Sequence, residues 1–223
     1  MSTAVLFTSS VRGRATCALI RTGDAADAPP LHPAEEELKY AMAPGRWGDF
    51  TAGRLAAAQA LSAIGASGPV LRKGRSPMFP PGVKGAISHS AGHVGASLVS
   101  RCREVVSVGV DVERTDRLSR EAERIVCTPW ERAWVAGAGR PQSRLSVLFS
   151  VKEAVYKAIS ALRPDRRPTF HDAEVRFGRT DLRVSLVPGL LPYGFRLTGE
   201  VRLVKDSYAV ASVLVLAPGA RLH

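Results

Sequence analysis

"VSVGVDVERTD", residues 106–116, is a strongly β-forming run that carries two acids where a strand would normally end. Side chains alternate between the two faces of a strand, so this strand has one face of valines and one face that holds the acids. The first face contains Val106, Val108, Val110 and Val112, and the second contains Ser107, Gly109, Asp111 and Glu113. The valine face predicts a buried core. The opposite face needs a separate explanation.

The two acids share one face and lie about 7 Å apart along the strand, at ~3.3 Å per residue. Their carboxylates can converge on one hard cation, which would offset their mutual repulsion. Gly109 leaves room just before Asp111 and Glu113, so another group could approach the backbone closely. The alternative is that the strand ends at Val112 and both acids are solvated, with Arg114 as a surface partner.

"RLSVLFSVKEAVYKAISAL", residues 144–162, predicts a helix, because its apolar residues recur every three or four positions. The apolar stripe consists of Leu148, Val151, Val155, Ile159 and Leu162, and the opposite face holds Ser146, Ser150, Glu153, Lys157 and Ser160. Glu153 and Lys157 are one turn apart and can form a surface ion pair on a solvated face. Alternatively, Glu153 completes a Mg²⁺ site and Lys157 binds phosphate, with the small serines allowing close approach.

The rest of the chain reads as two α+β halves of similar layout. Predicted strands lie at residues 4–7, 14–22, 85–90, 93–100 and 104–113, and again in the tail at 173–177, 182–187, 194–204 and 208–216. The strands at 85–113 have short connections, which favour antiparallel neighbours. Predicted helices lie at 31–41, 45–68, 119–126 and 128–137. In the last, Thr128 is the cap, Pro129 takes the first helical position and Glu131 closes a capping box. Residues 71–85, rich in proline and glycine, predict a surface loop.

Composition sets outer limits on the function. The chain has 223 residues, 31 Lys+Arg against 20 Asp+Glu and a net charge of +11, which predicts affinity for polyanions unless the excess only reflects an arginine-rich proteome. The three cysteines, at 17, 102 and 127, form neither a zinc pattern nor a disulfide framework. No apolar run approaches the roughly 18 residues of a membrane helix, and no secretory signal opens the chain. We therefore expect a cytoplasmic protein.

Four stretches occur together in one order: "GRLAAAQAL" (53–61), "PMFPPGVKGAISHS" (77–90), "VGVDVE" (108–113) and "FSVKEAVYK" (149–157). This set resembles the Sfp-type 4′-phosphopantetheinyl transferases, and the proline-rich run into "ISHS" is most similar to their enterobactin-synthetase branch. Many relatives have tryptophan where this chain has Phe149, for which only local repacking is expected.

The resemblance implies a fold and a reaction. The fold is two similar α+β subdomains related by a pseudo-twofold, residues 1–108 binding coenzyme A and residues 109–223 holding metal and catalytic groups. The reaction transfers 4′-phosphopantetheine from coenzyme A to a serine of an acyl or peptidyl carrier protein of a polyketide or peptide synthase. It releases adenosine 3′,5′-bisphosphate and requires Mg²⁺. One chain supplies both halves, so a monomer is expected.

The resemblance also implies roles for particular residues. Asp111, Glu113 and Glu153 would hold Mg²⁺, with Glu153 as the favoured general base, directly or through a bound water. Lys157 would bind phosphate and ease departure of the bisphosphate. Lys152 would contact phosphate too, unless it is a solvent lysine. The remaining coenzyme contacts implied by the motifs are Ser88 and His89 on the phosphates, Arg46 and Arg54 on the 3′-phosphate, and Lys73 and Arg75 near the adenine.

Two other functions compete with this one. A basic RNA- or DNA-binding module would need clustered cations with aromatic residues to stack on bases, yet aromatic residues make up only 6% and no such motif is found. A family member that binds coenzyme A and carrier but has lost catalysis would be expected to lack acidic residues. The presence of Asp111, Glu113, Glu153 and Lys157 argues against it.

Overall fold

The computed structural model describes residues 3–23, 28–74, 76–163, 165–166, 168–178, 182–205 and 207–221. The chain divides into two compact units, Met1–Arg103 and Glu104–His223. Each unit combines helices with antiparallel sheet, which confirms the predicted α+β class. The predicted division at 108/109 falls within a strand of the second unit, and the pseudo-twofold stays a prediction. Within the residues described, none of the helices has the length and apolar character to cross a bilayer.

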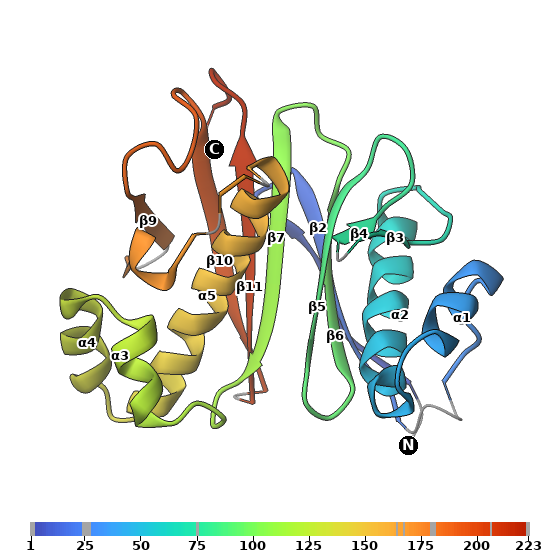
Figure 1. Cartoon of the computed structure of the whole chain (residues 1–223), viewed down its shortest axis with the longest axis horizontal. Helices are drawn as coiled ribbons and strands as arrows, with labels where there is room; N and C mark the ends of the chain where they lie inside the picture. Colours follow the sequence, from blue (N-terminus) through green and yellow to red (C-terminus); the bar gives the residue numbers. More distant parts are fainter. Residues whose placement is uncertain are drawn as a thin grey trace. The chain divides into compact units, whose positions relative to one another are not determined.

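The first unit is built on an antiparallel sheet that helix α2 covers on one face (Figure 1). Its strands are β1 (Ala4–Val11), β2 (Ala15–Arg21), β5 (Lys84–Ser90) and β6 (Val94–Ser100), in the order β1-β2-β6-β5. Its helices are α1 (Pro33–Tyr40), the 3-10 turn η1 (Pro44–Arg46) and α2 (Trp47–Ala63). The alanines of α2 at 52, 56, 57 and 60 are fully buried, so the helix lies close to the sheet.

Residues 71–85 were predicted to form a loop, and this prediction is wrong for its first part. The segment forms a hairpin of β3 (Leu71–Lys73) and β4 (Ser76–Met78), with Arg72 opposite Pro77. A proline is tolerated in such a strand because one side of an edge strand needs no N–H for the ladder. The proline content therefore hid the pairing.

The second unit has an antiparallel sheet in the order β10-β11-β7 and a separate pair, β8-β9. Its strands are β7 (Val105–Arg114), β8 (Ala173–Phe177), β9 (Leu182–Leu186), β10 (Arg196–Val204) and β11 (Tyr208–Leu216). Its helical segments are η2 (Arg120–Ala122), α3 (Glu123–Val126), α4 (Pro129–Ala136), α5 (Pro141–Leu162) and η3 (Phe170–Asp172). The predicted pairing of β7 with β6 is wrong: β6 is hydrogen-bonded to β2 and β5 on its two edges, and β7 pairs with β11 instead.

Helix α5 packs along β7 (Figure 1). It covers the face of β7 that carries Ser107 and Gly109. The Ser107 hydroxyl donates to the carbonyl of Ala158 at 2.7 Å, and the Ser150 hydroxyl donates to the carbonyl of Asp111 at 3.2 Å. A Cβ on Gly109 would overlap the carbonyl oxygen of Ala154. The group that approaches the backbone at Gly109 is thus the backbone of α5, in keeping with the expectation that this glycine allows a close approach.

The predicted apolar stripe of α5 lies in the core. Leu148, Val151 and Ile159 are fully buried and belong to one cluster with Val213 and Val215 of β11. The serines at 146 and 150 are buried as well, because the face of α5 that they occupy packs toward β7.

A buried ion pair joins α4 to α5. The predicted capping box is present, with the Glu131 carboxylate accepting from the Thr128 N–H at 2.7 Å. The same carboxylate accepts from Lys152 Nζ at 2.6 Å and from the Val175 N–H at 2.7 Å. Lys152 also donates to the carbonyls of Val126 at 2.8 Å and Phe170 at 2.7 Å. One charge pair thus fixes α3, α4, η3 and β8 against α5.

Gly109→Ala should lower the free energy of unfolding by about 1–3 kcal/mol, because the added methyl must push α5 away from β7. Urea unfolding measures this. Gly139→Ala is the matched control, since nothing lies within 4 Å of a Cβ there, and its effect should stay within about 0.5 kcal/mol. Equal stability of the two variants would show that α5 and β7 do not pack this closely.

Lys152→Met should lower the free energy of unfolding by about 3–5 kcal/mol, because it leaves the Glu131 carboxylate buried without its counter-charge. Lys205→Met, at an exposed lysine of the same unit, controls for loss of one charge and should change stability by less than about 0.5 kcal/mol. Thermal and urea unfolding should agree, and a Lys152→Met protein as stable as its control would contradict the buried pair.

Candidate functional site

The close packing of α5 on β7 brings the predicted acidic and basic residues of the second unit together. Asp111 is 4% exposed, and its Oδ1 accepts from Lys157 Nζ at 2.7 Å. Lys157 also donates to the carbonyl of Val110 at 3.1 Å, and its side chain is 29% exposed. Lys157 thus pairs with Asp111 on the neighbouring strand, so the alternative of a Glu153–Lys157 pair on a solvated face does not describe this lysine.

The carboxylates influence one another electrostatically. Burial and the neighbouring Asp111 carboxylate raise the pKa of Glu113 to about 7, and Glu153 adds to that rise. Burial, and again Asp111, raise the pKa of Glu153, while Lys157 lowers it. The three acids therefore occupy one region of negative potential that the Lys157 ammonium only partly offsets.

Among the described residues, no group of three His, Cys, Asp or Glu side chains is arranged to hold a metal ion. A site in which Asp111, Glu113 and Glu153 all ligate one Mg²⁺ therefore stays a prediction. The donor chemistry does fit this ion, which commonly takes one or two carboxylates and completes its shell with water and phosphate oxygens. Glu113 Oε2 is buried and accepts no hydrogen bond from the described residues, and Arg117 Nη1 lies 3.9 Å from it.

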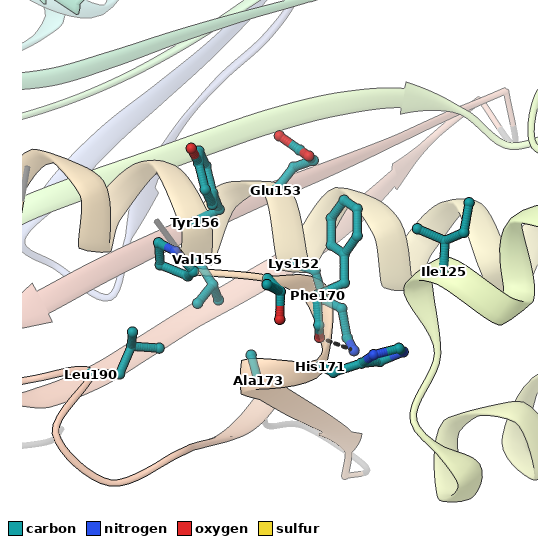
Figure 2. Close-up of a pocket in the computed structure, with 11 residues that line it drawn as sticks. Ile125, Lys152, Glu153, Val155, Tyr156, Phe170, His171, Ala173 and Leu190 are labelled. Atoms are coloured by element: carbon teal, nitrogen blue, oxygen red, sulfur yellow. Dashed lines mark hydrogen bonds between the residues drawn. The ribbon is translucent and has the colours of Figure 1, made fainter. Parts of the chain in front are cut away.

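A cavity of about 450 Å³ lies beside Glu153, and its lining is mainly apolar (Figure 2). Its walls are Ile125, Lys152, Glu153, Val155, Tyr156, Pro168, Thr169, Phe170, His171, Ala173 and Leu190. Figure 2 shows Glu153 and Tyr156 on one side of α5, whereas Lys152 extends on the other side toward the Phe170 carbonyl. The mainly apolar lining suits a flexible, uncharged chain, and Glu153 forms part of its edge.

Lys152 was predicted to contact phosphate or to be a solvent lysine, and the structure supports neither. Its side chain is 1% exposed, and its ammonium donates to Glu131 and to two backbone carbonyls. These three bonds use the three protons of the ammonium. Lys152 therefore holds the wall of the cavity, including Phe170, in place.

In the first unit, a second pocket brings together three of the predicted coenzyme contacts, Arg46, Arg54 and His89. The pocket measures about 220 Å³ and is also lined by Met42, Asp49, Phe50, Gly53, Arg72, Pro77 and Ile87. Helix α2, the hairpin β3-β4 and strand β5 supply most of the lining, and Met42 and Arg46 come from the segment just before α2. An anionic ligand of the size of a few phosphate groups would meet several cations here.

Arg54 forms the buried wall of this pocket. Its guanidinium stacks over the Phe50 ring at 4.5 Å, and Nε lies 3.7 Å from Glu35 Oε1. Burial lowers the pKa of Arg54 to about 10, and the Glu35 carboxylate opposes this change. Arg54 thus remains charged at neutral pH and is held in a fixed orientation.

Two predicted residues lie away from the pocket lining. Ser88 is buried and follows Ile87 on β5, so it points to the other face of the sheet from Ile87 and His89. Lys73 is exposed and does not line the pocket, whereas its neighbour Arg72 does. Arg75 lies outside the described residues.

Two lining residues, Arg72 and Asp49, were missed from the sequence. Arg72 could have been found by strand alternation had residues 71–73 been predicted as a strand. Asp49 could have been found from its spacing. Positions 46, 49, 50, 53 and 54 are three or four residues apart or adjacent, as expected for one face of the helix predicted over residues 45–68.

Comparisons with known proteins cover both units. Residues 107–211 match the family model of the 4′-phosphopantetheinyl transferase superfamily, and residues 34–99 match that of the 4′-phosphopantetheinyl transferase N-terminal domain. The 4′-phosphopantetheinyl transferase Svp of Streptomyces mobaraensis is 35% identical over 212 residues, which cover 87% of this chain and 83% of the relative. Enterobactin synthase component D of Salmonella typhi is 33% identical over 150 residues, covering 64% of this chain and 60% of the relative.

Among solved structures, the holo-[acyl-carrier-protein] synthase of Thermotoga maritima aligns with a TM-score of 0.43 and 21% identity, covering 51% of this chain and 64% of that one. The extent of the match to the Streptomyces relative decides the family, and the two family models agree with it. The chain belongs to the 4′-phosphopantetheinyl transferase superfamily, as its four motifs predicted.

Proposed function

We propose that this protein transfers 4′-phosphopantetheine from coenzyme A to a serine of a carrier protein, giving the holo-carrier and adenosine 3′,5′-bisphosphate. The observation that carries the proposal is the pairing of Lys157 with Asp111 beside Glu153, next to an apolar cavity, within the part of the chain that matches the superfamily. The relatives named 4′-phosphopantetheinyl transferase support the same activity.

The reaction breaks one phosphoanhydride bond. The serine oxygen attacks the β-phosphorus, a new P–O bond forms, and the bridging oxygen departs with the bisphosphate. The residues of the site must therefore accept one proton and offset the negative charge that gathers on the phosphates. Mg²⁺, when held by Asp111, Glu113 and Glu153, would polarise the diphosphate and shield this charge.

Glu153 would take the serine proton directly or through a water. Without a bound cation, burial and Asp111 raise the pKa of Glu153; a cation held by the same carboxylate would oppose this rise, so the route through a water keeps its role as base compatible with metal binding. Lys157 is held by Asp111 and the Val110 carbonyl while part of its side chain stays exposed. Its charge can therefore meet the departing phosphate without a large rearrangement.

The cavity beside Glu153 supports a place for the pantetheine arm. That arm is uncharged and carries two amides, so a mainly apolar cavity with a few polar groups suits it. Lys152 contributes by fixing the Phe170 backbone at the cavity wall.

The pocket of the first unit supports a place for the nucleotide end of coenzyme A. Arg46, Arg54 and Arg72 offer positive charge to its phosphates, and His89 lies on the same lining. The lining of this pocket does not support contacts from Lys73 and Ser88. A contact from Arg75, which lies outside the described residues, stays a prediction.

We further propose a cytoplasmic monomer that serves a carrier domain of a polyketide or peptide synthase. The Salmonella relatives named enterobactin synthase component D support a siderophore peptide synthetase as the first to test. The net charge of +11 favours an acidic carrier by long-range attraction.

Mass spectrometry of a purified apo-carrier, after incubation with the protein, coenzyme A and Mg²⁺, tests the activity. The carrier should gain the mass of one phosphopantetheine arm, and a carrier with its serine replaced by alanine should not. A panel of acidic carriers that all remain unmodified would contradict the proposal.

Glu153→Gln should reduce the transfer rate by about a hundredfold or more, because the amide cannot accept the serine proton. The free energy of unfolding should not fall, since the substitution removes a partly buried charge. Glu121→Gln, at an exposed carboxylate of the same unit, is the control and should keep the wild-type rate. A Glu153→Gln enzyme as fast as this control would remove Glu153 from the chemistry.

Glu113 should make the response to Mg²⁺ depend on pH. Its pKa of about 7 lies above the ordinary 4.5, so between these values the folded state binds more protons and stability falls as pH rises. Above pH 7 the carboxylate is ionised, and a bound cation would then restore stability.

Mg²⁺ should therefore raise the Tm of the wild type more at pH 8 than at pH 6, and Glu113→Gln should lose most of that difference. Differential scanning calorimetry with Mg²⁺ or with a chelator measures it. Equal Mg²⁺ responses of Glu113→Gln and Glu121→Gln would exclude Glu113 from the metal site.

A further inference from the structure

Two histidines share one carboxylate in the first unit. Asp49 Oδ2 lies 3.5 Å from His89 Nδ1, and Asp49 Oδ1 lies 3.6 Å from His93 Nδ1. Both distances are within ion-pair range, although longer than the usual hydrogen bond. Each oxygen of the carboxylate therefore faces a different imidazole.

The backbone fixes the second histidine. His93, in the turn between β5 and β6, has a left-handed φ of 55°, and its carbonyl accepts from the Thr22 N–H at 3.0 Å and from the Thr22 hydroxyl at 3.3 Å. The His93 ring occupies the space beside Gly48, where a Cβ would overlap it. Gly48, the residue before Asp49, thus leaves room for the His93 ring.

The arrangement orients His89. Because Asp49 approaches Nδ1, the nitrogen that can face a ligand in the pocket is Nε2. A carboxylate on one ring nitrogen selects the tautomer with its proton there and stabilises the imidazolium. A protonated ring would then donate Nε2–H to a phosphate oxygen.

We propose that Asp49 is a positioning residue that holds His89 as a phosphate-binding imidazolium, and that His93 competes for the same carboxylate. This inference rests on the proposed function, in which His89 contacts coenzyme A. Among the residues that the structure describes, the other charged groups of the pocket are Arg46, Arg54 and Arg72, with Glu35 behind Arg54. Arginine side chains do not titrate between pH ~6 and ~8.5, so a pH dependence of binding in this range has to come from other groups.

Isothermal titration of coenzyme A into the full chain, without carrier or Mg²⁺, tests the inference from pH 6 to 8.5. Wild-type affinity should decline as the pH rises and the imidazolium is lost. Asp49→Asn should bind coenzyme A about three- to fivefold more weakly near neutral pH, and its decline should begin at lower pH. Glu37→Gln, which removes an exposed carboxylate from the same unit, should match the wild type.

His93→Asn should act in the opposite direction. Asparagine tolerates the left-handed backbone at this turn, and Asp49 then serves a single imidazole. The decline in affinity should therefore begin at higher pH than in the wild type. If His93→Asn only loosened the turn, it would weaken coenzyme A binding at every pH and leave unchanged the pH at which the affinity begins to fall. That result would contradict the proposal that His93 and His89 share the Asp49 carboxylate.

Two further readouts separate positioning from catalysis. Asp49→Asn should raise KM for coenzyme A and leave kcat within about twofold, because the chemistry belongs to the other unit. In ¹⁵N-histidine NMR spectra, with signals assigned by His89→Asn, the neutral His89 ring should carry its proton on Nδ1 in the wild type and lose this preference in Asp49→Asn.

The outcomes distinguish the inference from the function on which it rests. A wild-type His89 protonated on Nε2 would overturn the inference whatever the protein binds. Binding of coenzyme A with an identical pH profile in Asp49→Asn would overturn it as well. If the wild type bound no coenzyme A, the proposed function would fail, and the tautomer measurement would still decide the role of Asp49.

Discussion

The contact between the backbone of α5 and the polar face of β7 is the constraint on which the second unit depends. Gly109 permits it, because any side chain there would meet the Ala154 carbonyl. Ser107 and Ser150 fasten it, each with a hydroxyl that donates to a backbone carbonyl across the contact. The two elements are far apart in sequence, yet this contact is what allows carboxylates from both to act on one another.

The buried, mutually repelling carboxylates lower the stability of the second unit, and favourable contacts elsewhere in the unit must offset this. Burial and mutual repulsion raise the pKa of both Glu113 and Glu153, so each resists ionisation in the folded chain. Lys157 neutralises Asp111 but not the whole group. Functional sites commonly sacrifice stability in this way. The compensation includes the apolar core around Leu148 and the buried Glu131–Lys152 pair.

Local patterns predicted the local structure well. The apolar spacing of residues 144–162 gave the buried stripe of α5, and Thr128 with Glu131 gave the cap of α4. The failures were non-local. The partner of β7 is a strand about a hundred residues further on, and no periodicity within β7 can indicate it. The hairpin that points Arg72 into its pocket was hidden by Pro77.

For the candidate site too, residues identified by local motifs were predicted, and roles that depend on distant partners were not. Motif resemblance selected Asp111, Glu153 and Lys157, which the fold brings together, because each lies in a stretch whose type was predicted correctly. It misjudged Lys152, whose counter-charge Glu131 lies on another helix. Asp49 was also overlooked, because the two histidines that lie near its carboxylate are about forty residues away in sequence and only the fold brings them there.

Lys152 and Glu153 are adjacent in the motif "FSVKEAVYK", yet adjacency in a motif does not give two residues the same role. Lys152 is buried and bonded to Glu131, whereas its neighbour Glu153 lines a cavity, so the two adjacent residues have different surroundings. An alignment column records only that a change is harmful. Assigning chemistry to every residue of such a motif would therefore overstate the number of groups that touch substrate. The yield of folded protein distinguishes a residue that supports the structure, such as Lys152, from one whose change affects the reaction alone.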